Sequence, residues 1–306
     1  MSEAVLLAPE RSALWRSFKR HPSAVLGAAV VAVIALGALL APLLAAQDPF
    51  NPAELELANS LLPPAWRGGG DARFLLGSDD QGRDMFSALL YGSRISLIVG
   101  LAAVAFAALV GISIGLVAGY AGGWVDALLM RIADIQLTFP AILIALMVDG
   151  FVRALMPVQA HEDIALYVLI FSIGIADWPQ FARVVRAGTG VQMTLGYVAA
   201  ARVMGAGPLR IVLGHILPNV LSSVFVLATL GFTTAIIAEA TLSFLGVGMP
   251  PTSPSLGTLI RIGNDYLFSG EWWITLFPSL TLVALALGVN VLGDWLRDAL
   301  NPRLRA

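Results

Sequence analysis

Few residues of this 306-residue chain combine the types and the spacing that catalysis requires. Gly111, Ser113 and Gly115 match the Gly-x-Ser-x-Gly pattern of serine hydrolases, in which a turn between a strand and a helix exposes the serine. Here the pattern lies inside a long hydrophobic run that predicts a helix. Together with Gly119, the glycines recur every four residues, which favours close contact between two helices. We therefore expect these residues to pack helices and not to supply a nucleophile.

The other ionisable candidates also lack a catalytic arrangement. Asp126 and Asp134 flank Arg131 and could form a proton relay, but we expect them to lie at a cytoplasmic helix end and to pair with Arg131. The three histidines stand too far apart for a local metal motif. Cysteine is absent, which excludes disulfides, thiolate chemistry and cysteine metal sites.

ATP hydrolysis through a Walker A motif is also excluded. That motif requires Gly-x-x-x-x-Gly-Lys-Ser/Thr, and the one lysine of the chain, Lys19, stands in a different context. We expect a non-catalytic protein without a bound metal or cofactor. Energy for any transport must come from another subunit or from an ion gradient.

Composition points to a lipid environment. The chain is 58% hydrophobic and 12% charged, and its mean hydropathy is +0.83. Soluble domains carry about 25% charged residues, so this chain has too little polar surface to be covered by water alone. The net charge of -2 and the absence of basic clusters give no sign of a nucleic-acid partner.

The hydrophobic runs predict an all-α, polytopic membrane protein with about six transmembrane helices. A helix of about 20 residues crosses the hydrocarbon core. The first run could instead be a cleaved signal peptide, but its 24 uncharged residues exceed the roughly 7–15 residues typical of that segment. The predicted spans cover residues 23–46, 95–125, 124–148, 164–181, 216–238 and 272–293.

The distribution of basic residues predicts the orientation. With a cytoplasmic N-terminus, the inner segments hold twelve basic residues and the outer segments six, as the positive-inside rule requires. Both termini are then cytoplasmic. The predicted organisation is a cytoplasmic segment 1–22, a first transmembrane helix 23–46, an extracytoplasmic loop 47–94, a core transmembrane domain 95–295 that contains a cytoplasmic loop 183–216, and a cytoplasmic tail 296–306.

The loop 183–216 contains a candidate docking element. Its middle reads Tyr197-Val-Ala-Ala-Ala-Arg-Val-Met-Gly-Ala-Gly-Pro208. The three alanines favour a helix, Gly205 is suited to end it, and Pro208 cannot continue it. We expect a short helix over residues 195–204. It could enter a groove on another protein or lie on the lipid surface, and the residues alone leave both alternatives open.

This segment resembles the coupling-loop motif of ABC-importer permeases, which reads Glu-Ala-Ala, three residues, Gly, and a later Leu-Pro. Ala200, Ala201, Gly205, Leu217 and Pro218 match with the correct spacing. Alanine replaces the glutamate at position 199, and histidine replaces the usual aliphatic residue at 215. The resemblance implies that ATPase subunits contact Tyr197, Ala200, Ala201, Arg202, Gly205 and Ala206.

Three further segments resemble the peptide/nickel subfamily of these permeases, so that the resemblance covers about residues 75–305. Residues 76–84 and 91–94 are similar to the segment before the second span, and residues 239–257 to the segment after the fifth, with Leu256 in place of the customary Trp. The third segment runs from Asn290 to Arg303. The charges around Gly77 to Asp84 could form a rigid turn by salt bridging or a surface for a receptor.

The resemblance implies a type I ABC importer permease fold in the bacterial inner membrane. It implies three kinds of partner besides lipid: a homologous second permease, two ATPase subunits that hold ATP and Mg²⁺, and an extracytoplasmic solute-binding protein. The expected cargo is a dipeptide or oligopeptide. The alternatives are nickel or another small solute, and a secondary transporter.

Two polar residues at membrane depth are candidates for the translocation pathway. Glu239 lies near the end of the fifth predicted span. It could hydrogen-bond neighbouring backbone at the helix end, or it could line the pathway and attract peptide N-termini. Asn290 could also contribute to the pathway, although hydrogen bonding between helices is the usual role of asparagine at this depth.

Overall fold

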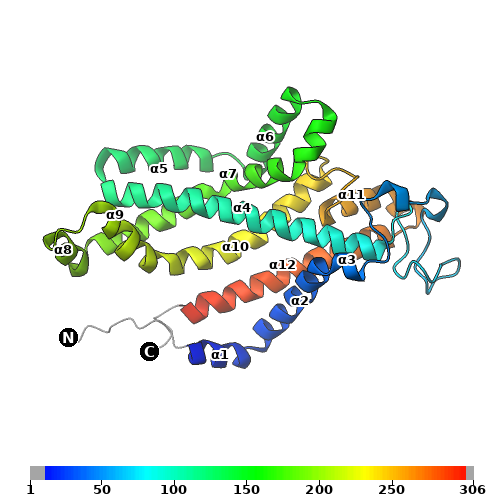
Figure 1. Cartoon of the computed structure of the whole chain (residues 1–306), viewed down its shortest axis with the longest axis horizontal. Coiled ribbons are helices and arrows are strands. Elements are labelled where there is room, and N and C mark those ends of the chain that lie inside the picture. Colours follow the sequence, from blue (N-terminus) through cyan, green and yellow to red (C-terminus); the bar gives the residue numbers. More distant parts are fainter. Residues whose placement is uncertain (1–10, 301–306) are drawn as a thin grey trace.

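The structure is a computed structural model that describes residues 11–300, and all of its named elements are helices (Figure 1). Residues 1–10 of the predicted N-terminal segment and residues 301–306 of the predicted tail, with Asn301 and Arg303 of the C-terminal motif, lie outside the described residues. The elements are α1 (Arg11–Arg20), α2 (Pro22–Leu39), α3 (Ala41–Leu44), η1 (Pro52–Glu54), η2 (Leu57–Asn59), α4 (Met85–Ala121), α5 (Gly123–Leu137), α6 (Ala141–Leu155), α7 (Val158–Met193), α8 (Gly196–Val203), α9 (Pro208–Ile211), the π-helical turn η3 (Val212–Ile216), α10 (Leu217–Phe244), α11 (Leu256–Tyr266), η4 (Leu267–Ser269) and α12 (Trp273–Leu300).

Five of the described helices are long and apolar enough to cross a membrane, and a bent pair would supply a sixth span. The five belong to α2, α4, α7, α10 and α12. The pair is α5 and α6, whose axes differ by 88°. The expected number of about six spans therefore holds if this pair is counted as one broken span.

The third span predicted over residues 124–148 is not one continuous helix. α5 ends at Leu137, and α6 begins only after Pro140. Proline has no backbone N–H, and it disfavours helical geometry at the residue before it, here Phe139. The chain therefore leaves the first helix at this point and turns before the second begins.

Three other predicted boundaries are also displaced. The first span breaks at Leu40, just before Pro42, so α2 is followed by the short α3. The outer loop predicted to reach residue 94 ends at Asp84, because that carboxylate accepts a hydrogen bond from the Ser87 amide at 2.8 Å and caps α4. The fourth helix continues to Met193, so residues 183–193 of the predicted loop are helical.

The core of the bundle is a close contact between α4 and α7. A side chain at Gly111 would place its Cβ 2.4 Å from the Cβ of Phe181. At Gly115 a Cβ would lie 2.6 Å from the carbonyl oxygen of Ala182, and at Gly119 it would lie 2.6 Å from the Cβ of Thr189. The expected packing role of this glycine series is confirmed, since no larger residue fits without moving the helices apart.

The molecule has two ends of different character (Figure 1). α8 and α9 lie at one end, where α1 and the C-terminal end of α12 also lie. The loop before α4 and the helix α11 lie at the opposite end. The long helices run between these two ends and carry most of the exposed large hydrophobic side chains, as lipid contact requires.

Candidate functional site

The short helix α8, predicted over residues 195–204, is present over Gly196–Val203 and ends on a glycine. Gly205 has a φ of +80°, a backbone conformation that favours glycine. Its amide donates to the carbonyl of Arg202, and the Ala206 amide donates to the carbonyl of Ala201, both at 3.0 Å. These two bonds form a Schellman motif, which satisfies the last carbonyls of the helix and fixes the direction of the chain after it.

α8 presents one face to its own chain and another to the outside. Val198 and Ala201 are buried at 0% and 2% exposure. Ala200 is exposed, and the tip of the helix carries Val203 and Met204 at 89% and 80% exposure. Of the two alanines predicted to contact an ATPase, Ala200 is exposed and Ala201 is packed inside the chain. The contact of α8 with an ATPase stays a prediction. We call Val203 and Met204, with the nearby exposed Leu209, the apolar tip.

Several contacts tie α8 to the membrane helices. Tyr197 donates its hydroxyl to Gln192 Oε1 at 2.6 Å, and the Arg202 guanidinium lies 5.9 Å from the ring centre of Tyr120 at the end of α4. Ala206 is partly buried against the main core cluster. α8 is therefore in direct contact with α4 and α7.

The carboxylates near this end do not pair as the sequence suggested. Asp126 binds Arg186 through two contacts, the shorter at 2.5 Å, and Asp134 pairs with Arg183. The predicted pairing of both with Arg131 is wrong, because the partners lie on α7, about 50–60 residues away in sequence. These pairs hold α5 against α7 at the end of the molecule that carries α8.

Glu239 is enclosed within the bundle. Its side chain is 0% exposed, and it accepts hydrogen bonds of 2.7 Å from the hydroxyls of Ser96 and Ser243. Ser96 in turn accepts a bond of 3.4 Å from the amide of Leu256. Glu239 on α10 is thus linked to α4 through the Ser96 hydroxyl and, through that same hydroxyl, to α11. Its hydrogen-bond donors are serine hydroxyls and not the neighbouring backbone amides that the sequence suggested. Asn290 lies on an exposed position of α12.

The charged turn before α4 is rigid and internally paired. Arg83 is completely buried, and its Nε donates to Asp79 Oδ2 at 2.6 Å. Its Nη1 donates to the carbonyl of Pro251 at 2.7 Å, which ties the turn to the segment after α10. Burial, and then the neighbouring Asp79 carboxylate, raise the pKa of Asp80. The internal salt bridging expected for this turn is present, and its contact with a receptor stays a prediction.

Leu256, at the position where the resembling family has Trp, is also fully buried at this outer end. It belongs to a cluster with Met85, Trp273 and Ile274. The indole Nε1 of Trp273 donates to the carbonyl of Ser78 at 3.0 Å, so the cluster lies directly beneath the charged turn.

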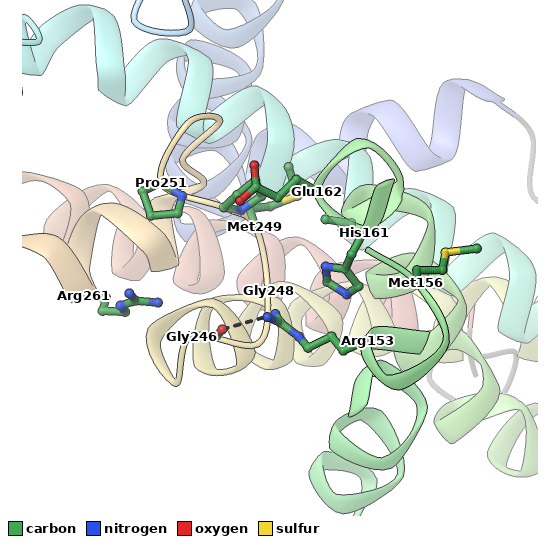
Figure 2. A pocket seen from close by; sticks show the side chains of 11 residues that line it. Arg153, Met156, His161, Glu162, Gly246, Gly248, Met249, Pro251 and Arg261 are labelled. Carbon is green, nitrogen blue, oxygen red and sulfur yellow. Dashed lines mark hydrogen bonds between the residues drawn. The ribbon is translucent and has the colours of Figure 1, made fainter. Parts of the chain in front are cut away.

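A cavity of about 300 Å³ opens between the segment after α10 and the α6–α7 hairpin (Figure 2). Its charged lining consists of Arg153, Glu162 and Arg261, together with His161. Arg153 donates to Asp149 at 2.5 Å and to the carbonyl of Gly246 at 3.4 Å, the bond drawn in Figure 2. His161 contacts the same Asp149 at 3.0 Å. We call this the outer cavity, since it lies at the end opposite α8.

A second cavity of about 300 Å³ lies within the spans and contains a carboxylate that the sequence reasoning missed. It is bounded by α6, α7 and α10, and Asp177 of α7 lines it. We call it the inner cavity. The signal for it was an acidic residue, followed by Trp178 and Pro179, inside a hydrophobic segment, where charge is costly and usually functional.

These features define a polytopic membrane protein, with several helices long enough to span a membrane, cavities between its helices and an exposed helix at one end. A family model described as "Binding-protein-dependent transport system inner membrane component" matches residues 111–306. A second, described as "N-terminal TM domain of oligopeptide transport permease C", matches residues 11–64. The chain belongs to the family of binding-protein-dependent transport system inner membrane components.

Individual relatives cover almost the whole chain. The di/tripeptide transport system permease protein DppC of Pseudomonas aeruginosa is 38% identical over 291 residues, which are 95% of this chain and 91% of that protein. The dipeptide transport system permease protein DppC of Escherichia coli K12 is 40% identical over 95% of this chain and 92% of that protein. Among solved structures, the inward-facing MetNI methionine ABC transporter shares the fold, with a TM-score of 0.57 and 22% identity over 71% of this chain and 98% of that chain.

Proposed function

We propose that this chain is the permease subunit of an ATP-driven importer that carries dipeptides or oligopeptides across the bacterial inner membrane. The relatives named as dipeptide and di/tripeptide permeases support the cargo. The observation that carries the coupling mechanism is the apolar tip of α8, which projects at one end of the molecule with Val203 at 89% exposure. Nickel or another small solute is the alternative cargo within the same mechanism.

The complete transporter then contains a homologous second permease, two ATPase subunits with ATP and Mg²⁺, and an extracytoplasmic solute-binding protein. The end that carries α8 faces the cytoplasm, together with both termini. The outer cavity faces the receptor and receives the peptide, since it offers both a carboxylate and guanidinium groups to a zwitterion. A secondary transporter would have no use for a projecting helix with an apolar tip.

Coupling follows from the attachment of α8. Closure of the ATPase pair moves α8, and the buried Val198 and Ala201 transmit that movement because close packing cannot absorb it. The contact between Arg202 and Tyr120 carries it to α4, and the chain through η3 carries it to α10. The two states of the transporter must differ by only a few kcal/mol if ATP and the loaded receptor are to shift the balance.

The test is retention of the ATPase by the chain that carries Val203→Glu and Met204→Glu. Both side chains are exposed, so the fold should be preserved. Each new carboxylate would be buried without a partner at the contact. The binding free energy between this chain and the ATPase should fall by about 2 kcal/mol, which is typical of a central interface residue. This loss lowers the affinity for the ATPase about thirtyfold. Co-purification of the ATPase subunits with the tagged chain measures this effect.

The matched control is Leu57→Glu, at a residue that is 73% exposed at the opposite end of the molecule. It should retain the ATPase in normal amounts. If the double variant at the tip also retained stoichiometric ATPase and full transport, the tip would lie on lipid and the proposed coupling would be wrong.

A further inference from the structure

Asp177 occupies an unusual position among the acidic residues of the spans. It lies on α7 within the spanning segment Ala160–Met193, two residues before Pro179. Its side chain lines the inner cavity and is partly exposed there. Ionisable groups at this depth are expensive, and they normally pair with another group or serve transport.

No other described residue neutralises Asp177. Among residues 11–300, its carboxylate has neither a hydrogen-bond donor nor a basic partner. Three other acidic residues of the membrane helices do have such contacts: Asp149 binds Arg153, Asp126 binds Arg186, and Glu239 accepts two hydroxyls. The packing of this chain therefore gives no structural reason for the carboxylate of Asp177.

The chemistry of the inner cavity specifies what it can accept. Its hydroxyl groups belong to Thr234 and Thr241 of α10. Both hydroxyls donate to their own helix, to the carbonyls of Gly231 and Ile237 at 2.9 and 2.7 Å. Their oxygens remain free to accept, as do those of Asp177. The polar side-chain atoms of the cavity are thus acceptors around one negative charge, which fits a cation with several N–H donors.

The rest of the lining is small or aliphatic, with Ala141 and Ala145 on α6, Ala176 on α7 and Ala238 on α10. A volume of about 300 Å³ is at the lower end of small-ligand sites. The three lining helices are α6, which follows the bend after α5, and α7 and α10, which α8, α9 and η3 join in sequence.

We propose that Asp177 binds the α-ammonium group of the peptide during its passage through the membrane. This inference rests on the proposed function and assigns a substrate contact to it. An ammonium group offers three donors, which match the carboxylate and the threonine oxygens. Every unblocked peptide carries this group, so the contact gives affinity for peptides of any sequence. The alanine walls leave space for the first side chain.

The experiment measures the local charge and transport in the same reconstituted complex. The chain contains no cysteine, so Thr234→Cys introduces a thiol into the inner cavity without further changes to this subunit. The rates at which a cationic and an anionic methanethiosulfonate of similar size modify this thiol are compared. Each rate is divided by the rate of the same reagent with a free thiol in solution.

With Asp177 present, the cationic reagent should react faster by about tenfold, the effect of one close charge in a partly dehydrated site. Asp177→Asn should abolish this preference, and Asp177→Glu should keep it. A transported dipeptide should protect the thiol only when residue 177 is acidic.

Transport and assembly separate the possible outcomes. Asp177→Asn should lower ATP-dependent dipeptide uptake about tenfold, the effect expected from the loss of one charge-assisted contact, while the second permease and the ATPase remain bound. Asp177→Glu should restore most of the uptake.

If Asp177→Asn released the second permease, the carboxylate would instead pair with a cation on that subunit and the proposal would be overturned. Full uptake by Asp177→Asn would also overturn it. If the wild-type complex moved no peptide at all, the proposed function itself would fail, and the thiol reactivity would still report whether Asp177 binds cations.

Discussion

Several charged residues of this protein are paired inside the chain, and Arg83 is the clearest case. It is completely buried and joins Asp79 to the carbonyl of Pro251. Removing one member of a buried pair leaves an uncompensated charge, which costs more than the pair contributes in net stability. The turn before α4 therefore depends on this side chain.

Arg83→Leu should destabilise the protein by about 3–5 kcal/mol, because it leaves the buried carboxylate of Asp79 without a cation. The matched control is Arg73→Leu, whose ion pair with Asp71 is exposed at 2.8 Å, and exposed pairs contribute about 0–1 kcal/mol. Thermal unfolding of the purified protein in detergent compares the two. Equal melting temperatures for both variants would show that the Arg83 pair is not important for stability.

Residue-level prediction succeeded where the cause was local. The positive φ of Gly205 follows from its position after a run of helix formers, and the four-residue repeat of Gly111, Gly115 and Gly119 specifies a close helix contact. It failed where the partner is distant. Arg186 approaches Asp126 only because α5 and α7 are neighbours, and no local spacing contains that information.

At the scale of elements, the end of α8 determines how the apolar tip is presented. The positive φ of Gly205 is the conformation that other L-residues adopt only with strain. No atom within 4 Å would meet a Cβ at this position, so any effect of a substitution is purely conformational.

Gly205→Ala should therefore weaken the end of α8 by about 1–2 kcal/mol. Gly207→Ala is the control, since it is equally open but has a φ of -69°, which any residue adopts. Hydrogen exchange of the Gly205 and Ala206 amides should become about tenfold faster in the first variant and stay unchanged in the second. Unchanged exchange in both would mean that the Schellman motif does not depend on glycine.

Sequence reasoning found the short helix but misplaced the ends of several long ones. Charged residues do not mark the ends of these helices, because Arg94 lies inside α4 and Arg183 inside α7. The Arg94 side chain is exposed, and Arg183 pairs with Asp134, so neither charge ends its helix. The bend between α5 and α6 was missed, although Pro140 was a local signal for it.

At the scale of the whole molecule, the arrangement of the ends predicts its orientation in the membrane. α1 lies at the same end as α8, and the loop that contains Leu57 lies at the other end (Figure 1). Lys19 of α1 and Leu57 are both exposed. Because the native chain has no cysteine, single cysteines at these two positions report the sides of the membrane without background from this subunit.

A membrane-impermeant maleimide should label Leu57→Cys in intact spheroplasts and Lys19→Cys only after the spheroplasts are permeabilised. This result is expected because segments rich in Lys and Arg remain on the cytoplasmic side of the membrane, and the α8 end carries the excess of basic residues. Labelling of Lys19→Cys in intact spheroplasts would place α8 outside, where no ATP is available, and would contradict the coupling mechanism.

The central claim, that this subunit forms the membrane path of a peptide importer powered by ATP, is tested most directly by uptake into proteoliposomes. The complete complex is reconstituted, the loaded binding protein and a radiolabelled dipeptide are added outside, and ATP with Mg²⁺ is enclosed in the lumen. Ionophores remove every ion gradient. We predict uptake that requires lumenal ATP and stops when the ATPase subunits are omitted. Uptake that persisted without ATP, and that an imposed proton or sodium gradient accelerated, would contradict the account and identify a secondary transporter.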